Sequence, residues 1–142
     1  GSGGGQKSLS VAQVAKQYIG VNAGRLADTS LRDDVISHAM DDRAFGLTVK
    51  RNVEESQSTT APSYVSSMFK LYGTEQNKKR YELMLTAMGS QMLGWEGEGF
   101  EPGEISETRG WLRSKGNSIE GGTSEVQKNI ITRRGLGLPK NF

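Results

Sequence analysis

The sequence has 142 residues, of which 34% are hydrophobic and 24% charged, and its formal net charge at pH 7 is +2. This composition is typical of one folded domain. It excludes a membrane-spanning segment and a charge-dominated disordered chain, and the charge is too small to favour nucleic acid as a partner. Cysteine is absent and His38 is the one histidine, which excludes disulfides, thiolate catalysis and a histidine-built metal site. We therefore expect a cytoplasmic protein with no metal, no membrane contact and no nucleic-acid partner.

Glycine-rich chain precedes the first predicted element. Residues 1–5 read Gly-Ser-Gly-Gly-Gly, and because this composition offers no side chain to anchor it, residues 1–7 are expected to be a flexible lead-in. The segment is either a cloning linker or native chain. A helical domain is expected over residues 8–139, with a short tail over residues 140–142. The first helix is predicted by an apolar stripe at helical spacing, made by Val11, Val14, Ala15, Tyr18 and Ile19.

The second predicted helix is apolar on two sides. It is expected to begin at Ser30, because Ser30 and Asp33 have the spacing of a capping box. A helix with two apolar sides belongs in the middle of a bundle or between subunits. One side holds Leu31, Val35, Ala39, Phe45, Val49 and Val53, and the other holds Ile36, Met40, Ala44 and Leu47.

Two more helices and a loop follow. Pro62 suits the first turn of a third helix, whose apolar stripe extends to Met88, and Gly73 within it would permit a kink. Four glycines between residues 94 and 103 predict a loop. A shorter fourth helix that ends near Gly116 is indicated by Ile105, Arg109 and Leu112. No segment shows a convincing strand alternation, so the predicted fold is all-α, an up-and-down bundle of four to five helices.

The last predicted helix follows the segment Gly121-Gly122-Thr123-Ser124. Ser124 with Gln127 fits a capping box, and the buried side of the helix is assigned to Val126, Ile130 and Ile131. Two glycines before a capped helix let backbone N–H groups approach a ligand at the positive end of the helix dipole. The hydroxyls of Thr123 and Ser124 and the carboxylate of Glu125 add polar contacts. A pyrophosphate or a ribose would suit this segment, although a simple turn is the commoner role of such residues.

Three other features are interpreted as structural. His38 is read as a packed histidine bonded to a nearby acid, because no activated nucleophile accompanies it. The basic run over residues 77–80 lacks interleaved aromatics and is read as a solvated helix face. Trp95 and Trp111 are read as partly buried packing residues rather than stacking platforms for a ligand.

The end of the chain carries a specific resemblance. The run Gly-Thr-Ser-Glu-Val-Gln over residues 122–127, the Asn-Ile-Ile over residues 129–131 and the Leu-Gly-Leu-Pro over residues 136–139 together resemble the C-terminal signature of acyl-CoA dehydrogenases. The preceding helices agree in number, length and order with the C-terminal helical domain of that family. The resemblance extends from Ser8 onward and covers about the last third of a complete family member.

The resemblance implies a flavoprotein that uses FAD to introduce an α,β double bond into an acyl-CoA thioester. In that family a glutamate removes the α-proton, the β-hydrogen leaves as hydride to the flavin, and electrons pass to an electron-transfer flavoprotein. FAD lies at a subunit interface, which implies a homo- or hetero-oligomer. Carried over to this sequence, Thr123, Ser124 and Glu125 would contact FAD, and Gly122 would lie beside the thioester or the flavin.

The sequence departs from the family pattern at the position of the base. Many members have the catalytic glutamate directly before Gly-Thr-Ser, where this chain has Gly121. Glu120 lies one residue earlier, and on an extended loop this shift aims the side chain elsewhere. Glu120 is therefore one candidate for the base, and a glutamate upstream of Gly1 is the favoured one. Arg43-Ala44-Phe45-Gly46 has the letters of the family's flavin-binding arginine segment with the wrong spacing, so no such role is assigned to it.

Two non-enzymatic alternatives stay open. The chain could be a helical assembly module, or the degenerate partner subunit of a heteromeric dehydrogenase, in which the two-sided second helix drives association. A nucleic-acid-binding bundle that uses Lys78, Lys79 and Arg80 is a weaker alternative.

Overall fold

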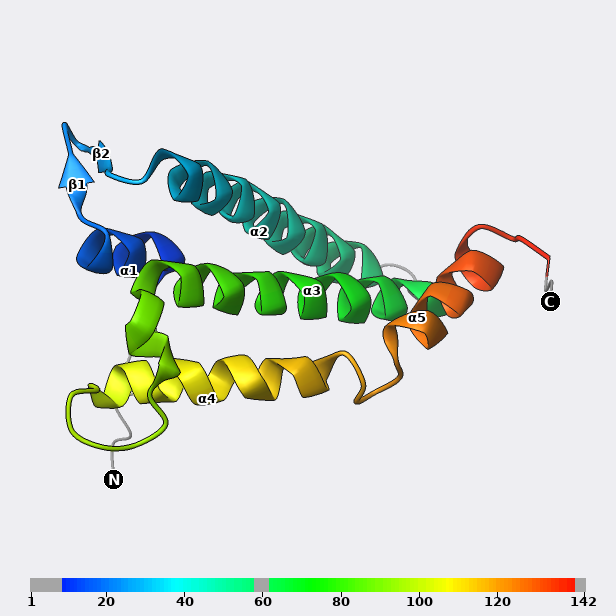
Figure 1. Ribbon diagram of the computed structural model, residues 1–142. Helices are drawn as coiled ribbons and strands as arrows, with labels where there is room; N and C mark the ends of the chain where they lie inside the picture. The colour runs from blue at the N-terminus through cyan, green and yellow to red at the C-terminus, as the bar shows by residue number, and fades with distance from the viewer. Residues whose placement is uncertain (1–8, 58–61, 140–142) are drawn as a thin grey trace, which may run out of the picture.

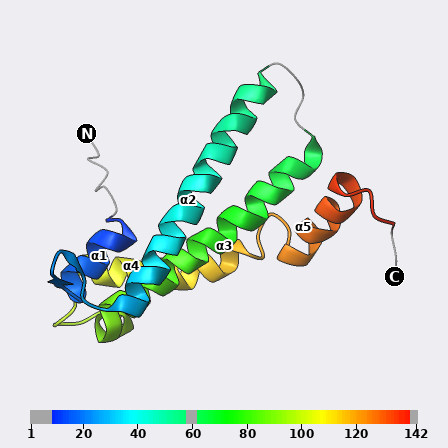
Figure 2. The same cartoon turned by 90° about the horizontal axis from the view of Figure 1, so that it is seen from above.

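The computed structural model describes residues 9–57 and 62–139, and in this part of the chain five α-helices make up most of the structure (Figures 1 and 2). The predicted all-α fold is confirmed. The expected flexible lead-in over residues 1–7 and the tail over residues 140–142 lie outside the described residues, as does part of the polar segment before Pro62.

Helix α1 (Val11–Tyr18) forms where the first apolar stripe predicts it. Its N-terminus is closed by a capping box, in which Ser10 Oγ accepts from Gln13 N at 3.2 Å and Gln13 Oε1 accepts from Ser10 N at 2.8 Å. A small hairpin of β1 (Val21–Asn22) and β2 (Arg25–Leu26) follows. These strands were not predicted from the sequence, because a strand of two residues is too short to show an alternating pattern. The turn between them needs positive φ at both Ala23 and Gly24.

Helix α2 (Thr29–Ser56) begins two residues before its predicted cap would place it. Asp28 is the N-cap, and its Oδ1 accepts from Leu31 N at 2.8 Å. The prediction of Ser30 as the cap was wrong, because Ser30 already lies inside the first helical turn. Both residues are good N-cap types, and the extended backbone at Asp28 decides between them.

Helix α3 (Ser63–Met88) is the central helix of the bundle and lies between α2 and α4 (Figure 1). It also packs against α1 and α5. The second helix was expected either in the middle of a bundle or between subunits. Within the described chain it is α3, and not α2, that lies in the middle. The helix is continuous through Gly73, where the absence of a side chain makes room for the Phe45 ring of α2. Phe45 also packs against Phe69 and Tyr72, with ring centroids 5.9 and 5.1 Å away.

Helix α4 (Pro102–Asn117) follows a 3₁₀ turn (Gly89–Leu93) and the predicted glycine-rich loop. The helix is confirmed, but the residues that indicated it do not form its buried side. Arg109 and Leu112 are exposed, and the buried positions are polar: Glu104, Thr108 and Ser114. Thr108 illustrates the reason, since its hydroxyl donates to Met92 O at 3.0 Å and ties α4 to the 3₁₀ turn.

Helix α5 (Ser124–Ile130) runs into a π-helical turn (Ile131–Gly135) that packs on the first half of α3. Its N-cap is Thr123, whose Oγ1 accepts from Val126 N at 3.3 Å, so the prediction of Ser124 as the cap was wrong by one residue. Val126 is 47% exposed rather than buried. The buried residue of α5 is Gln127.

The apolar core lies at one end of the bundle. It joins α1, the start of α2, the second half of α3 and the 3₁₀ turn, through Val11, Val14, Ala15, Leu31, Val35, Leu83, Met84, Ala87, Met88 and Met92. The other end, where α5 meets the start of α3, has no member of this core cluster. The Gly-Thr-Ser segment therefore lies at the less buried end of the bundle.

Candidate functional site

The loop from α4 to α5 contains two glycines in a left-handed conformation. Gly121 has φ +66° and Gly122 has φ +100°, values that glycine adopts without the penalty paid by other residues. At Gly122 a Cβ atom would also lie 2.5 Å from Gln127 Nε2. Glycine is thus favoured at position 122 by its φ angle, and an alanine there would also displace the Gln127 amide.

Both carbonyls of this double glycine are held by side chains. Gln127 Nε2 donates to Gly121 O at 2.9 Å, and Lys70 Nζ, from α3, donates to Gly122 O at 2.5 Å. In a trans peptide the N–H points opposite to the carbonyl, so the N–H groups of Gly122 and Thr123 face away from these partners. No described residue accepts a hydrogen bond from either N–H. The loop therefore presents two backbone donors without a partner in the described chain.

The three side chains that follow are not equivalent. The Thr123 hydroxyl caps α5 and also donates to the Glu125 carboxylate. The pKa of Glu125 is lowered by a hydrogen bond from its own backbone N–H and then by this hydroxyl. The Ser124 hydroxyl makes no hydrogen bond to a described residue. Of the three residues predicted to contact a cofactor through their side chains, Ser124 has the most available one.

Glu120 is bound to α4 rather than to the double glycine. Its carboxylate lies 2.7 Å from Arg113 Nη2, and both side chains are more than half exposed. The hydrogen bond that Arg113 donates to Glu120 raises the pKa of Arg113. The Glu120 carboxylate therefore points toward Arg113 on α4. Glu120 is adjacent to the loop in sequence and engaged elsewhere in space.

Lys70 and Gln127 are the residues of this site that sequence reasoning missed or misread. Gln127 was assigned to a capping box with Ser124, whereas it binds Gly121 O. Lys70 had no local signal, because its partner lies 52 residues away in the chain. Only the packing of α5 against α3 brings them together.

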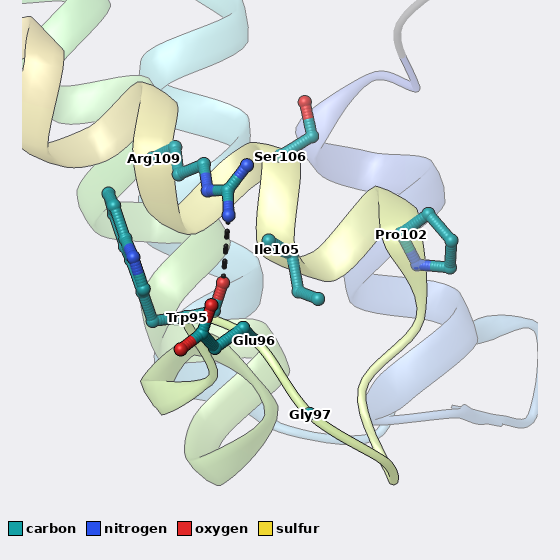
Figure 3. Close-up of a pocket in the computed structure, with 7 residues that line it drawn as sticks. All are labelled: Trp95, Glu96, Gly97, Pro102, Ile105, Ser106 and Arg109. Atoms are coloured by element: carbon teal, nitrogen blue, oxygen red, sulfur yellow. Dashed lines mark hydrogen bonds between the residues drawn. The ribbon is translucent and has the colours of Figure 1, made fainter.

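Two cavities in the described part of the chain lie away from this loop. One, of about 400 Å³, lies between the start of α4 and the preceding loop (Figure 3). In it the Arg109 guanidinium covers the Trp95 ring at 4.8 Å from the centroid and donates to Trp95 O at 3.1 Å. Trp95 is thus a packing partner of Arg109. Since a 16-residue helix is about 24 Å long, α4 separates this cavity from the double glycine.

A second cavity, of about 580 Å³, lies between α1 and the start of α4. On its wall Tyr18 Oη donates to the buried Glu104 at 2.5 Å, and Glu104 also accepts from Glu101 N at 2.8 Å. Burial and then this hydrogen bond raise the pKa of Tyr18 to about 12. The carboxylate is therefore satisfied by its own neighbours.

The remaining predictions for individual side chains have mixed outcomes. His38 is buried, as expected of a packing residue, but its Nδ1 has no hydrogen-bond partner, so the expected bond to an acid is absent at that atom. Within residues 9–57 and 62–139, histidine and acidic side chains do not gather into a group of three that could hold a metal ion. None of the helices described there is both long and apolar enough to cross a membrane.

Comparison with known proteins adds the family. The model of the acyl-CoA dehydrogenase C-terminal domain matches residues 9–136. Searches of curated proteins and of solved structures gave no match. The matched range contains all five helices and the complete double-glycine loop. With its helical fold and this match over nearly its whole length, the chain belongs to the acyl-CoA dehydrogenase family, as a C-terminal domain.

Proposed function

We propose that this chain is the C-terminal domain of an FAD-dependent acyl-CoA dehydrogenase that introduces an α,β double bond into an acyl-CoA thioester. Electron-transfer flavoprotein is the proposed acceptor, and the cytoplasm the proposed location. The observation that carries the proposal is the double-glycine loop, whose carbonyls are bound by Gln127 and Lys70 and whose N–H groups have no described acceptor.

The donors of this loop fit an oxygen-rich cofactor. FAD carries phosphate, ribose and ring carbonyl oxygens, and backbone N–H groups and hydroxyls are the donors that bind such oxygens. In the proposal the N–H groups of Gly122 and Thr123 and the hydroxyl of Ser124 contact FAD. Glu125 borders the site with a carboxylate already satisfied by its own helix. Bound FAD would supply the hydride acceptor that the reaction needs.

The outer side of α2 is the proposed oligomer interface. Ile36, Met40 and Leu47 are 50%, 68% and 49% exposed, because α3 covers only the opposite side of α2. Three large apolar side chains on one exposed side are unusual for a helix that faces only water. A helix with two apolar sides was expected either in the middle of a bundle or between subunits, and these exposed side chains favour the position between subunits.

The first experiment compares two glycine variants of the protein produced from its complete gene. Gly122→Ala and Gly137→Ala both place alanine at a positive φ angle, but only the first meets a neighbour, Gln127. We expect Gly122→Ala to lose bound FAD and Gly137→Ala to retain it, as measured by the visible flavin spectrum. A wild-type protein with no flavin that does not bind added FAD would refute the proposal.

The proposal places the catalytic base upstream of Gly1 rather than at Glu120. General-base catalysis requires the carboxylate within hydrogen-bonding reach of the substrate proton, and Glu120 is instead engaged by Arg113. Glu120→Gln should therefore leave kcat within about twofold of wild type, since no catalytic proton transfer is removed. A loss of several orders of magnitude with FAD still bound would identify Glu120 as the base.

A second candidate rests on the same exposed side of α2. A non-catalytic assembly module, or the degenerate subunit of a heteromeric dehydrogenase, would use this surface and would not need the loop donors. It predicts an oligomer without flavin affinity. The Gly122→Ala experiment separates the two, because only the first candidate gives a flavin signal to lose.

A further inference from the structure

We propose that Lys70 of α3 is a positioning residue for the proposed cofactor site: its ammonium group fixes the peptide between Gly122 and Thr123 in the orientation that presents the Thr123 N–H. This inference rests on the proposed function and names a residue outside the signature segment. The observation behind it is the hydrogen bond of 2.5 Å from Lys70 Nζ to Gly122 O.

Lys70 differs from the other lysines of α3 in that it binds the loop carbonyl and not a carboxylate. Lys78 and Lys79 on the same helix form ion pairs, with Glu75 at 2.8 Å and Asp41 at 3.7 Å. Lys70 has no carboxylate partner among residues 9–57 and 62–139. Its side chain is half-buried, and its Cε would be 3.9 Å from a Cβ at Gly121, so its stem follows the loop before its end reaches the carbonyl.

Such a contact has a geometric consequence. The hydrogen bond from a charged donor is stronger than one between neutral groups, and a glycine pair has more backbone freedom than any other two residues. Because the peptide is planar and trans, fixing Gly122 O also fixes the direction of the Thr123 N–H. Without Lys70, Gln127 would hold only the preceding peptide, through Gly121 O, and the second one would be free to rotate.

Helix α3 also holds the far end of the same segment. Arg134 Nη1 donates to Ser63 Oγ at 3.1 Å, and a Cβ at Gly135 would be 3.2 Å from the Tyr64 ring. The start of α3 therefore contacts the chain both before and after α5. Of these contacts, only the one from Lys70 reaches the double glycine.

The test uses three variants of the protein produced from its complete gene. Lys70→Met keeps the aliphatic stem and removes the donor, Lys70→Arg keeps a charged donor, and Lys78→Met is the matched control on the same helix. One readout is the FAD dissociation constant of the apoprotein. The other is amide hydrogen exchange over residues 118–125 without FAD, which does not depend on any ligand.

We expect Lys70→Met to raise the FAD dissociation constant by about tenfold, the usual effect of losing one charged hydrogen bond, and to speed exchange in the loop. Lys70→Arg should restore most of both, and Lys78→Met should change neither. Should Lys70→Met misfold, Lys70→Gln, which is too short to reach Gly122 O, replaces it. Unchanged affinity and exchange in Lys70→Met would overturn the inference. If wild type binds no FAD, the proposed function fails, and the exchange comparison alone still decides whether Lys70 orders the loop.

Discussion

Gly94 lies where the 3₁₀ turn gives way to the loop before α4, and the Phe100 ring packs directly over it. A Cβ at this position would overlap three atoms of that ring, at 2.3, 2.4 and 2.7 Å, so the ring or the loop would have to shift. Gly94→Ala should therefore lower the free energy of unfolding by about 1–3 kcal/mol, as overpacking does. Chemical denaturation measures it.

Gly46 provides the contrast for this prediction. It lies within α2 and a Cβ there would meet nothing within 4 Å. Gly46→Ala should raise the free energy of unfolding by up to about 1 kcal/mol, because alanine is the better helix former. Equal effects of the two substitutions would show that Phe100 does not pack as described.

Tyr18 should make the free energy of unfolding of the domain depend on pH in the alkaline range. Its pKa is raised to about 12 in the folded state, from 10.0, by burial and by the hydrogen bond to Glu104. Between these two values the unfolded chain has lost the proton and the folded chain has kept it. The contribution of Tyr18 to the free energy of unfolding is therefore fully present below pH 10.0 and is lost as the pH rises to about 12. The loss attributable to Tyr18 should be about 2 kcal/mol, after allowing for the water that reaches the ring.

Tyr18→Phe should remove this part of the decline and cost about 1–2 kcal/mol at neutral pH, because Glu104 loses a donor while buried. Thermal unfolding at a series of pH values measures both effects. Tyr72→Phe, at a half-exposed ring, is the matched control and should retain the alkaline decline. An unchanged decline in Tyr18→Phe would contradict the assignment.

The N-terminus of α2 is capped by one side-chain hydrogen bond, which Asp28 accepts from Leu31 N. Asp28→Ala should cost about 1 kcal/mol of stability, whereas Ser30→Ala should change it by less than half of that. Urea denaturation of the two variants compares them directly. A larger loss from Ser30→Ala would restore the sequence-based assignment of the cap.

Helices were predictable from the sequence because their apolar periodicity extends over many residues and can be recognised even where the helix ends are misplaced by one or two residues. The stripe that ends at Ile19 and the break before Pro62 indicated helices that the structure confirms. Caps were less predictable, since Asp28 and Ser30, or Thr123 and Ser124, are equally suitable side chains and the backbone angle chooses between them.

The candidate site was predictable to the extent that it is local. The Gly-Thr-Ser signature identified the loop, and the left-handed φ angles of Gly121 and Gly122 explain why glycines stand there. What the sequence could not give were the contacts across the fold: Lys70 to Gly122 O, and Glu120 turned toward Arg113. Polar burial on α4 was hidden for the same reason, because Glu104 is satisfied by Tyr18, which is 86 residues earlier.

At the scale of the whole molecule, burial is uneven. The apolar core fills the end formed by α1 and the 3₁₀ turn, while the outer side of α2 and the segment around α5 stay open. The proposed interface and the proposed cofactor loop both use these open surfaces. We therefore expect other protein surfaces to cover these two regions, as the proposed subunit interface requires.

The last prediction tests this at the outer side of α2. Leu47 is 49% exposed there, and Leu93, in the 3₁₀ turn, is 78% exposed at a distance from it. If the outer side of α2 is buried between subunits, Leu47→Glu places a charge in that interface and should weaken the association of the subunits at least tenfold. Leu93→Glu adds the same charge outside the interface and should leave the mass in solution unchanged. Sedimentation equilibrium of the complete protein measures both. If only Leu93→Glu dissociates the oligomer, the interface lies near the 3₁₀ turn and not on α2. If neither substitution changes the mass in solution, the outer side of α2 is not a subunit interface.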